Sequence, residues 1–178
     1  MKIIIIRHGK VDYKWRQWST SKEFNEDCRM YDQSPLKPVR YVAPQINVKN
    51  IYISTLRRSK DTAYQLYGDR DCTISELIDE VPMSASIAIN KKCPLLFWYV
   101  SGRVGWFLNS QRQKESRKET ILRADEFADI ISKENENCAV ITHGFFMHTL
   151  ISVMKRKGFK IKKHSLHFKN GECVIAER

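Results

Sequence analysis

Two histidines with matching surroundings are the residues of this chain best suited to chemistry. His8 follows the apolar run 3–6, His143 follows the apolar run 139–141, and a glycine comes directly after each histidine. Short apolar runs rich in β-branched residues are typical of strands buried on both faces of a parallel sheet. Because ligands of such sheets bind beyond the carboxyl ends of the strands, we expect both histidines at one functional edge.

Two arginines are predicted to reach the same edge. Arg7 directly precedes His8, and Arg58 lies at the start of a predicted helix, just after the short apolar run 50–53. Guanidinium groups match phosphate oxygens in bidentate fashion, and free N–H groups at helix starts favour anions. Together with His8 and His143, these arginines predict a site that binds a phosphoryl group.

Apolar patterning predicts strands that alternate with helices. The predicted strands are 2–6, 50–53, 73–78 and 138–141, and the predicted helices are 56–67, 116–132 and 145–154. This alternation predicts an α/β fold, a three-layer α/β/α sandwich with a mainly parallel central sheet. Near the C-terminus, Asn170-Gly171 separates the β-prone runs 165–168 and 172–176, which predicts an antiparallel edge hairpin.

The length of 178 residues predicts a single domain over 1–178. Two segments do not follow the strand–helix rhythm, about 11–35 and 83–113, and the second holds a cluster of aromatic residues. Such a cluster is usually part of a core. The alternative is a lid over a ligand site, because loops at strand ends carry function. Ser116 and Glu119 form the pattern of a capping box, which predicts the start of a helix.

Composition excludes several classes of protein. The chain is 42% hydrophobic with a net charge of +11, and no apolar run approaches the roughly 20 residues that span a bilayer. Its five cysteines contain no CxxC pair, which predicts a reducing cytoplasm and no zinc framework. The basic run 155–163 is interpreted as a solvated helix end, with binding of nucleic acid or of a membrane surface as the alternative. The net charge predicts anionic small molecules as partners, and the lack of a spanning run predicts no membrane partner.

At this point the motifs together resemble those of the histidine phosphatase superfamily, which includes the cofactor-dependent phosphoglycerate mutases. Residues 7–9 (RHG) resemble its opening motif, and residues 142–144 (THG) its second histidine motif. Residues 54–63 are similar to its S-x-L-x-R-A-x-x-T-A stretch, and residues 32–36 weakly resemble its D-x-P-L element. The pieces follow the family order and cover almost the whole chain.

The resemblance implies a reaction in two steps. Neutral His8 attacks a phosphate monoester and becomes phosphohistidine. Arg7, Arg58 and His143 stabilise the charge on the transferring oxygens. A carboxylic acid protonates the leaving oxygen and then activates the water that releases phosphate. No metal and no cofactor is required.

The carboxylic acid is expected just after the third strand. The family places a glutamate there in a pattern like L-x-E, and residues 78–80 (IDE) fit it conservatively. The resemblance therefore selects Glu80 as the acid, with Glu76 and Asp79 as alternatives. Residues 81–83 (VPM) stand where the family often has glycine and tryptophan, which leaves the substrate preference open.

Two further residues are possible substrate contacts. Lys10 stands where many family members have glutamate or glutamine, so its side chain either contacts phosphate or points to solvent. Gly144 permits close approach of the backbone just after the second histidine. Residues 115–116 (ES) resemble a pair that precedes the penultimate helix of phosphatase members, and we interpret them first as a helix cap.

Three functions are consistent with these residues. The first is a phosphomonoesterase acting on a small phosphorylated metabolite, a histidine acid phosphatase-type enzyme. The second is a phosphoglycerate-type mutase, which needs a closed pocket built by extra segments, for which a chain of 178 residues is short. The third is a non-catalytic binder of phosphorylated protein or of nucleic acid.

Overall fold

Six strands form the central sheet of the computed structural model, which describes residues 1–161 and 167–178. They are β1 (Lys2–Arg7), β3 (Asn50–Ile53), β4 (Thr73–Ile74), β6 (Cys138–Thr142), β7 (Lys160–Ile161) and β8 (Cys173–Glu177). Their order is β4-β3-β6-β1-β8-β7. Neighbours from β4 to β1 are parallel, whereas β8 pairs antiparallel with both β1 and β7. The mainly parallel sheet with an antiparallel edge is therefore confirmed.

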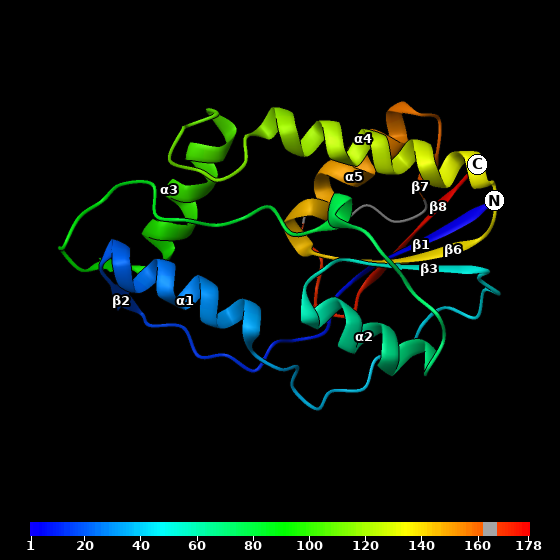
Figure 1. Cartoon of the computed structure of the whole chain (residues 1–178), viewed down its shortest axis with the longest axis horizontal. Helices are drawn as coiled ribbons and strands as arrows, with labels where there is room; N and C mark the ends of the chain where they lie inside the picture. The colour runs from blue at the N-terminus through cyan, green and yellow to red at the C-terminus, as the bar shows by residue number, and fades with distance from the viewer. Residues whose placement is uncertain (162–166) are drawn as a thin grey trace.

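Helices cover both faces of this sheet. They are α2 (Arg57–Tyr67), α4 (Arg117–Glu134) and α5 (Gly144–Arg156). Side chains alternate along a strand, so Ile3 and Ile5 of β1 join the core under α4 and α5, whereas Ile4 and Ile6 join the core on the side of α2. Figure 1 shows α4 and α5 on one side of the strands and α2 on the other, which confirms the three layers.

A second group of elements lies beyond the carboxyl ends of the parallel strands (Figure 1). It consists of β2 (Trp18–Ser19), α1 (Ser21–Gln33), β5 (Cys93–Pro94) and α3 (Leu95–Phe107). β2 pairs antiparallel with β5, and Phe24 of α1 stacks on Trp98 of α3 with ring centroids 5.7 Å apart. The two segments that break the strand–helix rhythm thus pack against each other next to the predicted functional edge.

The predicted strand 73–78 is wrong in its second half. β4 ends at Ile74, and the chain then forms a short 3₁₀ turn, η1 (Glu76–Ile78). The N–H of Ser75 still donates to the carbonyl of Ile53, but the turn then carries Ile78 out of the edge and into the core under α4 and α5. Burial of Ile78 therefore outweighs the strand propensity of the segment.

The antiparallel edge is built differently from the predicted hairpin. Asn170 and Gly171 form a turn, but His167 and Phe168 lie outside any strand, residues 165 and 166 lie outside the described residues, and the strand beside β8 is β7. Gly171 has φ of 75°, and a Cβ there would lie 1.9 Å from a ring carbon of Tyr41. Glycine is therefore required in this turn for both conformation and space.

The starts of α4 and α1 carry capping boxes, and the end of α5 is basic. Ser116 and Glu119 form the predicted capping box at the start of α4, and Thr20 and Glu23 form a second one at the start of α1. The second box has the same S/T-x-x-E pattern, so the sequence contained a signal for it. The basic run 155–163 begins in the last turn of α5, as interpreted, and its last two residues lie outside the described ranges.

None of the five cysteines forms a disulfide bond within the described residues. Within residues 1–161 and 167–178, no helix combines the length and the apolar character needed to cross a bilayer.

Candidate active site

His8 lies immediately after β1, where the chain leaves the middle of the sheet. Its backbone N–H donates to the carbonyl of Thr142 at 2.9 Å, which ties it to the end of β6. Its Nδ1 atom lies 2.7 Å from the carbonyl oxygen of Gly9. Because a carbonyl oxygen only accepts, Nδ1 carries the proton and Nε2 keeps its lone pair.

The surroundings of His8 keep its imidazole neutral. Burial and the nearby charge of Arg58 lower the pKa of His8 from 6.5 to about 3, with a smaller contribution from Arg7 and an opposing one from the hydrogen bond to Gly9. Above that pH the imidazole is neutral, which is the nucleophilic form.

The backbone around His8 is fixed by residues distant in sequence. The N–H of Gly9 donates to Thr62 Oγ1 at 2.8 Å, and that hydroxyl donates to the carbonyl of Arg58. Asn170 Nδ2 donates to the carbonyl of His8 at 3.1 Å. The contact of Asn170 was not predicted, since its Asn-Gly pair indicated only a turn.

Arg58 lies in the first turn of α2 and is almost fully buried. Its Nη1 donates to Asp32 Oδ1 at 2.7 Å, and its Nε donates to Nδ1 of His143 at 3.2 Å. The guanidinium carbon lies 5.1 Å from the centre of the Tyr31 ring. Asp32 and Tyr31 belong to α1, so the segment 11–35 contributes directly to the surroundings of this arginine.

His143 lies at the end of β6, beside His8. The two ring centroids are 5.1 Å apart. Because Nδ1 accepts from Arg58, Nε2 carries the proton and donates to Ser54 Oγ at 2.7 Å. Burial, followed by the charge of Arg58, holds the pKa of His143 well below 6.5. Its ring is fully buried and supports Arg58, while its predicted contact with phosphate stays a prediction.

Arg7 and Gly144 pack directly on each other. The Nη1 of Arg7 donates to the carbonyl of Phe168, and its Nε is buried without a hydrogen-bond partner among the described residues. A Cβ on Gly144 would lie 2.8 Å from that Nε. The glycine after the second histidine therefore makes room for the Arg7 guanidinium, a role that sequence reasoning had not assigned.

Glu80 sits at the N-terminus of α5. Its carboxylate accepts from the backbone N–H groups of Val81 and Phe146, both at 3.0 Å, and of Phe145 at 3.4 Å. These N–H groups fix the position of the Glu80 carboxyl group at the start of α5. Of the alternatives, Asp79 accepts from both the N–H and the hydroxyl of Thr55.

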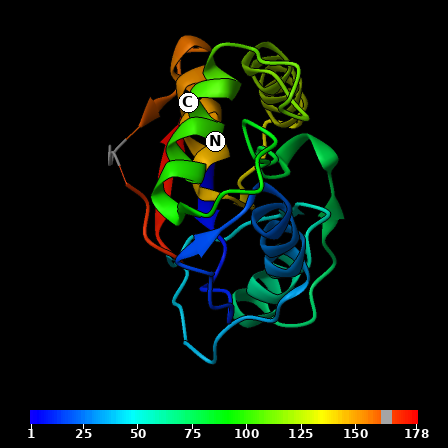
Figure 2. The ribbon, with the colours of Figure 1, turned by 90° about the vertical axis from the view of Figure 1, so that its left-hand side faces the viewer.

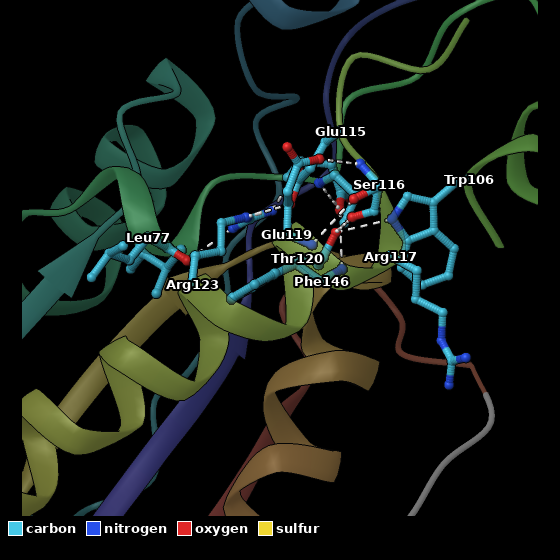
Figure 3. A network of polar contacts seen from close by, with 12 residues as sticks. Leu77, Trp106, Glu115, Ser116, Arg117, Glu119, Thr120, Arg123 and Phe146 are labelled. Atoms are coloured by element: carbon cyan, nitrogen blue, oxygen red, sulfur yellow. Dashed lines mark hydrogen bonds and ion pairs between the residues drawn. The ribbon is translucent and has the colours of Figure 1, made fainter. Parts of the chain in front are cut away.

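A polar network around Arg123 of α4 reaches Leu77, in the turn that precedes Glu80 (Figure 3). Arg123 donates to both carboxylate oxygens of Glu115, at 2.7 and 3.2 Å, and its Nη1 donates to the carbonyl of Leu77 at 2.8 Å. Its guanidinium also lies over the ring of Phe146 at 4.2 Å. Arg123 thus connects the turn before Glu80 with a residue whose N–H binds the Glu80 carboxylate.

Arg103 of α3 makes the equivalent connection on the other side. Its guanidinium lies over the ring of Phe145 at 3.6 Å, and its Nη1 donates to the carbonyl of Val81 at 3.3 Å. Burial lowers the pKa of Arg103. Neither Arg103 nor Arg123 was predicted, because nothing in the local pattern of α3 or α4 indicates contact with the loop of Glu80.

A cavity of about 1950 Å³ opens over these groups. It is lined by Arg7, His8, Arg58, Glu80, Glu76 and Asp79, and by residues of the segments 11–35 and 83–113 that include Trp15, Tyr31, Tyr99 and Arg103. The volume exceeds the roughly 300–1,000 Å³ of a typical small-molecule pocket. His167, which the sequence left without a role, also lines the cavity.

Lys10 is placed differently from Arg7, His8 and Arg58, which line the cavity. Its side chain is exposed and does not line the cavity, while its backbone N–H donates to the hydroxyl of Tyr41 at 2.9 Å. The solvent-facing alternative fits this placement better than a phosphate contact.

In the part of the chain that the structure describes, no group of His, Cys, Asp and Glu side chains is arranged to hold a metal ion.

Comparison with known proteins gives the family. A sequence model of the histidine phosphatase superfamily (branch 1) matches residues 3–178. The chain therefore belongs to the histidine phosphatase superfamily. No curated protein matches it in sequence.

Solved structures with the same fold are distant in sequence. A mutant phosphoserine phosphatase from Entamoeba histolytica in complex with phosphoserine is 16% identical, with a TM-score of 0.53 and coverage of 98% of this chain and 89% of that one. A putative alpha-ribazole-5'-P phosphatase from Escherichia coli is 15% identical, with a TM-score of 0.58 and coverage of 98% and 89%. A mycobacterial glucosyl-3-phosphoglycerate phosphatase is 12% identical, with a TM-score of 0.60 and coverage of 98% and 88%. At such identities the likeness concerns the fold.

Proposed function

We propose that this protein is a phosphomonoesterase that hydrolyses a small phosphorylated metabolite through a phosphohistidine on His8. The observation that carries the proposal is the state of His8, a buried neutral imidazole whose Nε2 keeps its lone pair beside Arg58. Membership of the histidine phosphatase superfamily supports it. The proposed acid phosphatase-type reaction needs no metal. The cytoplasm is the proposed location of the protein.

The first step transfers the phosphoryl group to the enzyme. Nε2 of His8 forms a bond to phosphorus as the ester P–O bond breaks, and Glu80 donates a proton to the leaving oxygen. The guanidinium groups of Arg7 and Arg58 stabilise the negative charge on the three equatorial oxygens. His143 holds Arg58 in place through its Nδ1.

The second step releases phosphate. Glu80, now ionised, takes a proton from a water molecule that attacks phosphorus, and the N–P bond to His8 breaks. The open cavity gives water access to this intermediate and supports hydrolysis rather than the closed transfer of a mutase. The substrates named for the structural neighbours, phosphoserine, alpha-ribazole-5'-phosphate and glucosyl-3-phosphoglycerate, are the first compounds to screen.

The nucleophile is tested with His8→Ala. We expect release of phosphate from p-nitrophenyl phosphate to fall by about 10³-fold or more, because the covalent route is lost, and a chelator to leave wild-type activity unchanged. Wild type should form an acid-labile phosphoenzyme that the variant lacks. His148→Ala, at an exposed histidine outside the cavity, serves as the matched control and should keep activity. Full activity of His8→Ala would overturn the proposal.

The acid is tested with Glu80→Gln. The variant should hydrolyse alkyl phosphates far more slowly than wild type, with a smaller loss for p-nitrophenyl phosphate, because a good leaving group needs less protonation. Glu76→Gln and Asp79→Asn are the matched controls and should not change the ratio of the two rates. An equal loss for both substrates in Glu80→Gln would remove Glu80 from this role.

Conversion of a phosphoglycerate into its isomer without phosphate release would favour the mutase instead.

A further inference from the structure

Helix α3 is apolar on two opposite sides. Trp98, Gly102 and Trp106 are buried against the rest of the molecule, as expected of the inner side of a surface helix. The outer side of such a helix is normally polar. Here it is formed by the apolar residues Leu96, Phe97, Val100, Val104 and Phe107, followed by Leu108, which we call the outer face of α3.

The residues of the outer face are exposed. Leu96, Phe107 and Leu108 keep 70%, 56% and 69% of their surface accessible. The spacing of Leu96, Val100 and Val104 by four residues aligns them along one stripe of the helix. Figure 2 looks onto α3 from outside the molecule and shows it in front of the central sheet. Contiguous exposed apolar surface of this kind marks a site of interaction.

An exposed tryptophan extends the outer face at one end. Trp18 of β2 is paired with Pro94, which directly precedes α3, and 60% of the tryptophan surface is accessible. Tryptophan has an apolar ring with a polar N–H group, a combination that favours the boundary between lipid and water.

Cations flank α3 in the sequence. From Val81 to Lys114 the sequence contains no Asp or Glu, and its basic residues are Lys91, Lys92, Arg103, Arg112 and Lys114. All of these except Arg103 are exposed; Lys91 and Lys92 come just before α3 and Arg112 shortly after it, whereas Lys114 lines the cavity of the candidate active site. Beyond them, Arg117 lies over the ring of the exposed Phe107 at 4.9 Å.

We propose that the outer face of α3 docks on the surface of a membrane that contains anionic lipid. Apolar side chains would enter the boundary between headgroups and acyl chains, while Lys91, Lys92 and Arg112 contact lipid phosphates. The prediction of no membrane partner rested on the lack of a spanning segment, and a helix of this kind lies on a bilayer without crossing it. A second copy of the chain is disfavoured as the occupant because both copies would bring the same cations together.

The test is sedimentation of the purified full chain with vesicles of phosphatidylserine and phosphatidylcholine, against vesicles of phosphatidylcholine alone. We expect binding to the first only, weakened by salt, with a blue shift of fluorescence that Trp18→Phe reduces. Leu96→Gln with Val104→Gln should lower the partition coefficient about tenfold. Lys91→Gln with Lys92→Gln should lower it about fivefold for each cation removed.

Matched variants at other exposed positions show whether the loss of vesicle binding is specific to the outer face of α3. Val42→Gln with Tyr64→Gln replaces two exposed apolar residues elsewhere, and Lys60→Gln with Lys133→Gln replaces two exposed lysines. These pairs should keep vesicle binding, and all variants should hydrolyse a soluble aryl phosphate like wild type, which keeps this test separate from that of the proposed function.

Three results would overturn the proposal. The first is a lack of binding to either kind of vesicle. The second is binding that the outer-face variants leave unchanged. The third is a concentration-dependent dimer in sedimentation equilibrium, lost in Leu96→Gln with Val104→Gln and unaffected by vesicles, which would assign the face to a second copy of this chain.

Discussion

Arg58 is held between two partners of different character. The carboxylate of Asp32 accepts from Nη1 at 2.7 Å, while the neutral imidazole of His143 accepts from Nε. Asp32 is partly exposed whereas Arg58 is buried, so the aspartate can move toward solvent when an anion arrives. In the proposed reaction, phosphate and Asp32 therefore compete for the same guanidinium group.

This competition predicts that Asp32→Asn strengthens the binding of inorganic phosphate. The amide oxygen can still accept from Arg58, but its negative charge is gone, so repulsion of the phosphate falls. We expect the inhibition constant for phosphate to decrease by about two- to tenfold at low ionic strength. Asp12→Asn, at an exposed carboxylate that pairs with Lys37, is the matched control and should leave the constant unchanged. Weaker phosphate binding in Asp32→Asn would show that the charge of Asp32 is needed to orient Arg58.

At the scale of elements, the loop that carries Glu80 is held from both sides by arginines of different helices. Arg123 of α4 binds the carbonyl of Leu77, and Arg103 of α3 binds the carbonyl of Val81. Each also lies over one of the two phenylalanine rings that open α5. The position of Glu80 therefore depends on α3, α4 and α5 together.

The ion pair between Glu115 and Arg123 should stabilise this arrangement more than an exposed pair does. Both side chains are largely buried, so Glu115→Gln leaves the Arg123 guanidinium group without a negative counter-charge, and we expect a loss of about 2–4 kcal/mol in the free energy of unfolding. Because the partners interact directly, Glu115→Gln with Arg123→Gln should cost less than the sum of the single variants. Chemical denaturation measures all three.

The exposed pair of Lys49 and Glu136 is the matched control for this cycle. Its atoms are 2.9 Å apart, but both side chains are exposed, and single replacements should cost less than about 1 kcal/mol. Additive losses for Glu115→Gln and Arg123→Gln would show that their contact contributes no coupling.

At the scale of the whole molecule, folding buries two neutral histidines that are charged in the unfolded chain at low pH. The pKa of His8 is lowered from 6.5 to about 3, and that of His143 is lowered well below 6.5. Between the folded and unfolded pKa values the unfolded chain binds more protons, so stability is complete above pH 6.5 and is lost as the pH falls toward 3.

His8→Asn should therefore flatten the dependence of stability on pH. Over pH 3 to 6.5 the free energy of unfolding of wild type should change with an additional slope of about 1.4 kcal/mol per pH unit from His8 alone. Denaturation at a series of pH values measures this slope as the difference between wild type and variant, which cancels the carboxylates that titrate in the same range. An unchanged slope in His8→Asn would contradict the burial of a neutral imidazole.

The local sequence pattern was sufficient to predict several regular elements of the fold. The buried runs of β1, β3 and β6 and the capping box of α4 were predicted close to their observed bounds, because strand burial and helix capping depend on neighbouring residues. The rule that parallel strands end at one edge also placed His8, Arg58 and His143 in one region, where the structure brings them together.

Only the tertiary structure decided the contacts between distant segments. These contacts join residues that are far apart in sequence, and the local sequence pattern gives no signal for such pairs. They are the hydrogen bond from Asn170 to the His8 carbonyl, the packing of Gly144 on Arg7, and the bonds of Arg103 and Arg123 to the loop of Glu80. The same holds for α3, whose composition indicated a buried aromatic cluster. Its outer face is exposed because the fold buries one side of the helix and leaves the other without a partner in the described part of the chain.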